Sequence, residues 1–141
     1  MSNYKFPVKQ ASTSIPSPQE PDLGKIKFSF KFYDPKHETS HNATFRNPYP
    51  KEFLIKLKEL ETWTVEKFID CREHTYRIHP IDWNDSNVSY RGFKLSKEYD
   101  ENAWQFSIKG NKHGRVHGFL IENIFYVVWL DPNHKVYPKD S

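Results

Sequence analysis

The chain contains a single cysteine, Cys71, among its 141 residues. One thiol excludes an internal disulfide framework and any zinc site built on paired thiolates. The sequence also lacks the uninterrupted run of roughly 18–20 apolar residues that a membrane helix needs, and its N-terminus lacks the apolar stretch of a secretory signal. We therefore expect a cytoplasmic protein in which Cys71 is buried and unreactive.

The net charge is small and the aromatic content is high. Lys and Arg number 21 against 18 Asp and Glu, a net of +3, and the chain has 11 Phe, 8 Tyr and 4 Trp. Aromatic side chains bury far more apolar area than a disordered chain contains, so we expect one folded domain with an aromatic core. Residues 1–24 hold four of the ten prolines and several serines, which predicts a disordered tail followed by a single domain over 25–141.

Apolar periodicity predicts one strand followed by two helices. Apolar and polar residues alternate from Lys25 to Phe32, as in a half-buried strand with a basic outer face. Thr64 is the predicted N-cap of a second, shorter helix. The first helix follows Pro48 and Pro50, and its apolar residues recur at helical spacing at Phe53, Leu54, Leu57 and Leu60.

The remainder of the chain predicts an antiparallel meander. A strand over 76–83 is interrupted by Pro80, which places it at a sheet edge or a bulge, and a clearer strand covers 103–109. The strongest signal is a hairpin of residues 115–121 and 124–130, joined by the two-residue turn Glu122-Asn123. The order strand, helix, helix, meander predicts an α+β domain with both helices packed on one face of the sheet.

The hairpin register decides which side chains share a face. A two-residue turn pairs His117 with Val128 and Arg115 with Leu130. One face of the sheet is expected to point to water, with Arg115 and His117 beside Lys109 of the preceding strand and its neighbours Gln105 and Ser107. The other face is wholly apolar and is expected to meet the helices; it carries Val116, Gly118, Leu120, Phe125, Val127 and Trp129.

Positive charge is concentrated next to the polar face. Lys109, Lys112, His113, Arg115 and His117 fall within nine residues that contain no acid. We expect this patch to attract an anionic partner although the net charge of the chain is small.

Three stretches near the C-terminus resemble the RelE/ParE superfamily of bacterial type II toxins, its YafQ and YoeB branches in particular. They are residues 115–119 (RVHGF), 125–129 (FYVVW) and 134–137 (HKVY), and the predicted element order over 25–138 is also that of the superfamily. The resemblance implies a RelE-like fold and an mRNA interferase, an endonuclease that cuts mRNA on the ribosome without a metal or other cofactor and is restrained by a cognate antitoxin. It implies, by position, catalytic roles for His117, His134, Arg115 and Tyr137.

The chemistry of these residue types suits RNA cleavage. The reaction needs a base for the ribose 2′-OH, a cation for the charge on the phosphorane and an acid for the leaving 5′-oxygen. Histidine suits both proton-transfer roles because its pKa of about 6.5 makes both forms available near neutrality. His117 and His134 could divide these roles, with Arg115 on the phosphate. Further RNA contacts are expected from Lys109, Lys112, His113, Tyr126, Gln105 and Ser107.

Three alternatives stay open. The same face could belong to a non-catalytic module, of the kind that phages and mobile elements encode, which binds nucleic acid or an acidic protein. His113, His117 and His134 could bind a metal, although no acid is placed to orient their rings. The fold could also serve a gyrase-poisoning toxin. Two histidines in the patch favour the enzyme, since binding alone needs only Lys and Arg.

Overall fold

The computed structural model describes residues 24–36, 45–81 and 101–134. They form two α-helices, a short 3₁₀ helix and a mixed five-stranded sheet, which confirms the predicted α+β class. The sheet order is β1-β5-β4-β3-β2, in which β1 runs parallel to β5 and the other neighbours are antiparallel. Within these ranges no helix is long and apolar enough to cross a membrane. The elements are β1 (Lys27–Ser29), α1 (Tyr49–Leu60), α2 (Val65–Asp70), η2 (His74–Tyr76), β2 (His79–Pro80), β3 (Ala103–Lys109), β4 (Lys112–Ile121) and β5 (Ile124–Asp131).

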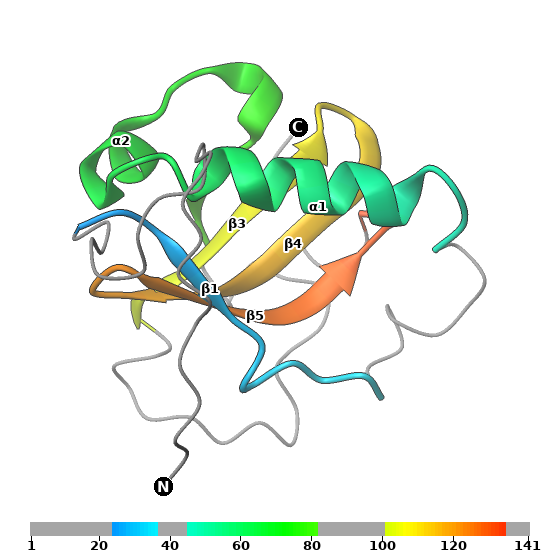
Figure 1. Ribbon diagram of the computed structural model, residues 1–141, viewed down its shortest axis with the longest axis horizontal. Coiled ribbons are helices and arrows are strands. Elements are labelled where there is room, and N and C mark those ends of the chain that lie inside the picture. Colours follow the sequence, from blue (N-terminus) through cyan, green and yellow to red (C-terminus); the bar gives the residue numbers. More distant parts are fainter. Residues whose placement is uncertain (1–23, 37–44, 82–100, 135–141) are drawn as a thin grey trace, which may run out of the picture.

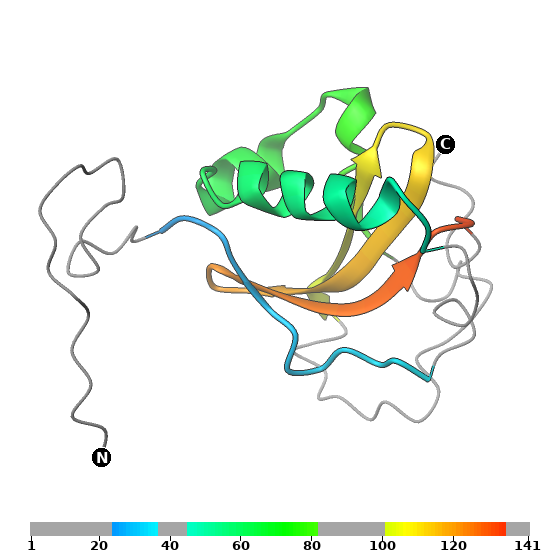
Figure 2. The same ribbon diagram turned by 45° about the vertical axis from the view of Figure 1, so that its right-hand side comes forward.

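Both helices cover the same face of the sheet, and α1 lies across the strands (Figure 1, Figure 2). The core between the helices and the sheet is aromatic, as predicted. Phe68 of α2 contacts Phe106 of β3 and Phe125 of β5, with ring centroids 6.3 and 6.0 Å apart. Each such ring removes on the order of 150–250 Å² from water, so this layer contributes much of the stability of the fold.

Local sequence explains where the helices begin. Pro50 lies in the first turn of α1, where a backbone N–H would have no helical partner in any case. Thr64 is the N-cap of α2, as predicted: its hydroxyl accepts a hydrogen bond of 3.1 Å from the Lys67 N–H. Cys71 follows α2 directly and is only partly buried.

Strand β1 is shorter than predicted. The alternation holds at Ile26, which is fully buried, and at Phe28, which packs against the core. It fails at Phe30, whose side chain is 49% exposed, because the strand ends there in a turn. Phe32 then contacts Tyr126 on the opposite face of the sheet, with ring centroids 5.3 Å apart.

The hairpin of β4 and β5 begins with the predicted register. Ile121 pairs with Ile124, and Glu122 in the turn has a φ of 55°. A bulge then shifts the pairing, so that His117 lies opposite Trp129 instead of the predicted Val128.

Beyond the bulge, the two faces of β5 are exchanged relative to the prediction. Leu130 packs against the helix-covered core, whereas Trp129 is buried outside it. Gly118 makes the bulge possible, because a Cβ there would lie 2.0 Å from the carbonyl oxygen of Tyr126.

Strand β2 contains Pro80 and pairs with β3 at the sheet edge, as predicted, but it has only two residues in place of the strand predicted from residue 76, because Tyr76 belongs to η2. Strand β3 has its predicted bounds, with Phe106 and Ile108 on the core side. Residues 82–100 and Tyr137 lie outside the described residues, as do residues 1–23 of the tail predicted over 1–24.

Candidate nucleic-acid interface

The side chains predicted to face water on the sheet are buried. On the face opposite the helices, His117 is 0% exposed and Arg115 is 2% exposed, and Gln105 and Ser107 are buried beside them. The prediction of a solvent-facing cationic surface at the centre of the sheet is therefore wrong.

The chain that follows β1 crosses this face and covers part of it (Figure 2). The Asp34 carboxylate accepts a hydrogen bond of 3.2 Å from the Trp129 indole N–H, and the Asp34 N–H donates to the Val128 carbonyl at 2.9 Å. Asp34 and Trp129 are 95 positions apart in the sequence. Strand patterns do not reveal contacts of that range.

The buried polar side chains form two rows across the central strands. Ser107, Arg115 and Asp131 lie opposite one another in one row, and Gln105 and His117 lie together in the next. Between the rows, His117 Nε2 lies 3.3 Å from Asp131 Oδ2, and both side chains are almost completely buried. A carboxylate that orients an imidazole is a feature of catalytic histidines, but here no part of the imidazole is exposed.

Several of these polar side chains hold irregular backbone against the sheet. The Ser107 hydroxyl donates to the Thr75 carbonyl at 2.8 Å, and the Gln105 amide donates to the Arg77 carbonyl at 3.3 Å. Both acceptors lie in the segment that connects α2 to β2, which has few strand partners of its own. Buried hydrogen bonds of this kind satisfy backbone groups that would otherwise be costly to bury.

Arg115 acts in the same way on the turn between β3 and β4. Its guanidinium donates to the carbonyl oxygens of Gly110 and Gly114 at 3.3 and 3.2 Å. Arg77 reaches the same turn and donates to the Asn111 side chain at 2.6 Å. Two buried arginines therefore stabilise the conformation of a turn that exposes Lys109 and Lys112 to solvent.

Because His117 is buried, neither His134 nor Tyr126 shares an exposed surface with it. His134 lies in a turn after β5 with a φ of 55°, and its N–H donates to the Asp131 carbonyl at 3.1 Å. Tyr126 is partly buried against Phe32. Among the residues that the structure describes, no three His, Cys, Asp or Glu side chains come together as metal ligands.

Exposed cations gather at the turn between β3 and β4. Lys109 and Lys112 pair across this turn and both are exposed, and His113 next to them is partly exposed. The Lys109 side chain is 57% exposed, and its ion pair with Glu52 of α1 is long, at 3.4 Å. Of the residues predicted to contact RNA, Lys109 and Lys112 are therefore exposed, and His113 is partly exposed.

The start of α1 lies against this turn through an aromatic contact. The Tyr49 ring meets the His113 ring edge-to-face, with centroids 5.8 Å apart and planes at 89°. Tyr49 is buried, and burial, with the nearby Tyr33 and Asp131, raises the pKa of its hydroxyl well above the ordinary value. The tyrosine is thus a neutral packing group at this position.

Two further cations come to the same place with the start of α1. Arg46 and Lys51 flank Tyr49 in the sequence and are exposed. Sequence patterns missed them, because only the tertiary contact of Tyr49 with His113 brings this segment to the turn. We call Arg46, Lys51, Lys109, Lys112 and His113 the basic end.

Among the described residues, exposed acids are most numerous near α2, at the opposite end of the molecule (Figure 1). Lys67 and Arg72 accompany them there. At the basic end, by contrast, the described part of the chain holds four Lys and Arg side chains and the partly exposed carboxylate of Glu52. The acids near α2 are Glu61, Glu66, Asp70 and Glu73.

No family model, no curated protein and no solved structure matches this chain, so its relation to the RelE/ParE superfamily stays a prediction from its C-terminal motifs.

Proposed function

We propose that this domain binds nucleic acid by holding phosphate groups at the basic end, without cutting the strand. The observation that carries the proposal is the separation of two groups of side chains. The lysines on the turn between β3 and β4 are exposed, whereas His117 and Arg115 are buried in the sheet. Exposed lysines can neutralise phosphates and release their counterions, which supplies most of the affinity of non-specific binding.

Helix α1 adds to the positive potential at this end. It starts at Tyr49, next to the turn, and its N-cap residue Pro48 offers no side-chain hydrogen bond to the first turn. The positive end of the helix dipole favours an anion nearby.

The composition of the basic end fits nucleic acid better than an acidic protein. Protein interfaces generally have an apolar centre, whereas nucleic-acid interfaces are polar and strongly positive. Among the described residues, the large apolar side chains that are exposed lie elsewhere: Phe30 after β1, Leu54 and Ile55 on the outward side of α1, and Ile69 on α2.

RNA cleavage by a toxin with a cognate antitoxin is a separate hypothesis, which makes a different demand on the sheet residues. It requires His117 and Arg115 to touch a phosphodiester. The His117 imidazole is instead held by Asp131, and the Arg115 guanidinium is held by two backbone carbonyls. The geometry therefore favours binding over cleavage.

The test is to measure binding of the full chain to a fluorescent single-stranded RNA, and to a DNA of the same sequence, by anisotropy. The double variant Lys109→Ala, Lys112→Ala should weaken RNA binding at least tenfold. The matched control Lys27→Ala, Lys67→Ala removes two exposed cations from β1 and α2, and should bind like the wild type.

Three results would overturn the proposal. Equal losses in both double variants would mean that the basic end has no special role. Binding of poly-glutamate as tight as that of RNA would indicate an acidic-protein site. A cleavage product that disappears in a folded His117→Asn variant would establish the nuclease instead.

A further inference from the structure

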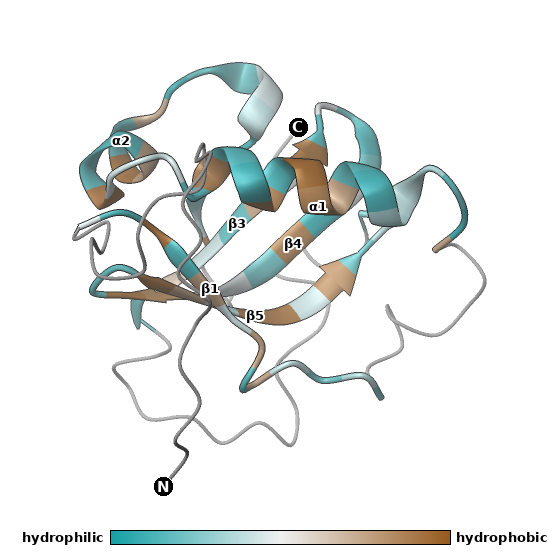
Figure 3. Ribbon diagram, in the orientation of Figure 1, coloured by the Kyte–Doolittle hydropathy of each residue, from teal (hydrophilic) through white to brown (hydrophobic). Residues whose placement is uncertain are grey.

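Helix α1 exposes apolar side chains on the side that faces away from the sheet. Its core side is formed by Tyr49, Leu57 and Leu60. On the other side, Leu54 is 64% exposed and Ile55 is 47% exposed. A helix that packs on a sheet normally presents polar residues to water, so this side departs from the expected amphipathic pattern. Figure 3 shows the hydrophobic segment in the middle of α1, with hydrophilic segments on both sides of it.

The apolar surface extends from α1 towards β1. Pro50 is exposed and lies one turn before Leu54, so the two are neighbours on the helix surface. Phe53 precedes Leu54 and meets the Phe30 ring, with centroids 6.4 Å apart. Phe30 is itself half exposed. Contiguous apolar patches of this kind mark sites of protein contact.

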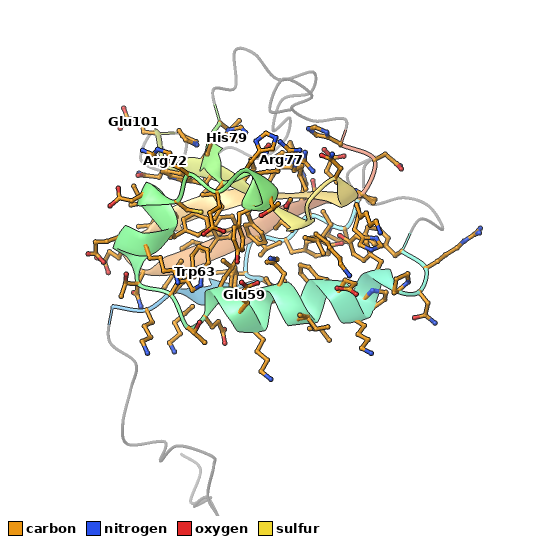
Figure 4. All side chains as sticks on the ribbon, turned by 90° about the horizontal axis from the view of Figure 1, so that it is seen from above. Glu59, Trp63, Arg72, Arg77, His79 and Glu101 are labelled. Carbon is orange, nitrogen blue, oxygen red and sulfur yellow. The ribbon has the colours of Figure 1, made fainter. Side chains whose placement is uncertain are left out.

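Lysines border the apolar side chains on the same side of the helix. Lys51 and Lys58 are exposed, and with Leu54 and Ile55 they follow the spacing of a single helix face. The acids of α1 point elsewhere: Glu52 pairs with Lys109, and Glu59 pairs with Lys56 at 2.9 Å. Figure 4 shows Glu59 on the sheet side of α1. We call Lys51, Leu54, Ile55 and Lys58 the α1 stripe.

An isologous pair of α1 helices does not fit the α1 stripe. Leu54 and Ile55 lie at its centre, and Lys51 and Lys58 lie equally far from that centre along the chain. An isologous antiparallel pair of α1 helices centred there would place Lys51 of each copy beside Lys58 of the other. Like charges at the rim oppose such a pair, whereas carboxylates on a different protein would complement it.

We propose that the α1 stripe is a docking site for an acidic amphipathic helix of another protein. Leucine-type side chains of the partner cover Leu54 and Ile55, and its Asp or Glu side chains meet Lys51 and Lys58. This is the helix-on-apolar-surface mode of recognition, in which anchors recur every three to four residues. The α1 stripe shares Lys51 with the basic end but does not include Lys109 or Lys112, so variants at Leu54, Ile55 and Lys58 test it separately from the turn between β3 and β4.

The probe is a stapled synthetic helix with leucines on one face and glutamates on both borders. We expect it to bind the full chain and to shift the backbone NMR signals of α1 while leaving those of the turn between β3 and β4 unchanged. The variant Leu54→Ser, Ile55→Ser should weaken binding at least tenfold, because it removes the apolar anchors. Lys58→Glu should weaken it about fivefold at low salt, and less at high salt.

Two controls show whether the effect belongs to the stripe. Ile69→Ser changes an exposed apolar residue on α2 and should leave binding unchanged. A probe with lysines in place of the glutamates should not bind. Circular dichroism and the melting temperature check that each variant is folded, and the exposed position of all four residues makes loss of fold unexpected.

Different experimental results are expected if something other than an acidic helix binds the α1 stripe. A dimer in sedimentation that the double serine variant dissolves would identify a second copy as the occupant. Binding to anionic phospholipid vesicles that the same variant abolishes, without binding of the acidic helix, would identify a lipid surface. Equal affinity for the acidic and basic probes, or shifts confined to the turn between β3 and β4, would also overturn the proposal.

Discussion

His117 on β4 and Asp131 on β5 meet inside the sheet, with Nε2 and Oδ2 3.3 Å apart, because β5 contains a bulge. In an unbroken ladder, His117 would face Val128 and Asp131 would lie on the core side of the sheet. The extra residue turns Asp131 onto the face that carries His117 and Arg115. The pair therefore results from the bulge and not from the turn that sets the hairpin register.

Removing the Asp131 carboxylate should destabilise the fold. Asp131→Ala leaves a buried imidazole without its acceptor, and we expect a loss of about 2–4 kcal/mol in the free energy of unfolding. Urea denaturation followed by tryptophan fluorescence measures it. Glu66→Ala, at an exposed acid on α2, is the control and should change the free energy by less than about 0.5 kcal/mol. Equal effects of the two changes would show that the pair contributes nothing.

Gly118 should tolerate no side chain. A Cβ there would lie 2.0 Å from the Tyr126 carbonyl oxygen and 2.7 Å from a ring carbon of Phe125. Relief requires the backbone of β5 to move, so we expect Gly118→Ala to cost about 3 kcal/mol or more, or to prevent folding. Thermal and urea unfolding measure the cost.

The matched control for this change is Gly110→Ala. Gly110 has a φ of 58°, but a Cβ there would meet nothing within 4 Å. Its cost should be limited to the left-handed backbone, about 1–2 kcal/mol. If both changes cost the same, the close approach of β5 to Gly118 is not rigid.

The features that the sequence predicted correctly have local causes. The N-cap at Thr64 depends on residues within one turn, and the bounds of β3 follow from alternation along a single strand. The pairing of Ile121 with Ile124 is set by the two-residue turn between them. Each of these interactions joins residues that are close in the sequence, so the local pattern of residue types is enough to predict it.

The errors arise where distant segments meet. No residue pattern marks Val128 as the bulge, and one extra residue exchanges the faces of everything beyond it. The burial of His117 and Arg115 also depends on contacts over long sequence distances, such as that of Asp34 with Trp129. The predicted cations Lys109 and Lys112 are exposed as expected, but Arg46 and Lys51 reach them only through the packing of Tyr49 on His113.

Glu59 and Tyr76 form a hydrogen bond that makes stability depend on pH at both extremes. The bond from the Tyr76 hydroxyl to the Glu59 carboxylate, with burial, raises the pKa of Tyr76 to about 12. Burial alone would raise the pKa of Glu59, but hydrogen bonds from Tyr76 and Lys56 and the charges of Lys56 and Lys67 lower it below its ordinary value.

The signs of the two pKa shifts define the pH window. A raised tyrosine pKa stabilises the fold below the unfolded pKa of about 10, and this stabilisation is lost as the pH rises towards the folded value. A lowered carboxyl pKa stabilises the fold above the unfolded pKa of about 4.3, and this is lost as the pH falls through the folded value. Tyr76→Phe should therefore be less stable than the wild type at neutral pH, and the difference should shrink at both extremes.

NMR titration of the Glu59 carboxyl carbon checks the same bond directly. The midpoint in Tyr76→Phe should be higher than in the wild type, because the hydrogen bond to the carboxylate is gone. Tyr126→Phe, a tyrosine far from Glu59 on the other face of the sheet, is the control. An unchanged Glu59 midpoint in Tyr76→Phe would contradict the role assigned to the hydroxyl.

The slope of RNA affinity against salt concentration should report how many lysines contact phosphates. Each phosphate contact made by a cation contributes about 0.7 to the slope of log affinity against log salt for a single strand. Removing Lys109 and Lys112 together should reduce that slope by about 1.4, whereas removing Lys27 and Lys67 should leave it unchanged. Anisotropy titrations at several salt concentrations give the slopes. If affinity falls in the Lys109 and Lys112 variant while its slope stays that of the wild type, the two lysines act on the conformation of the turn and do not contact phosphate.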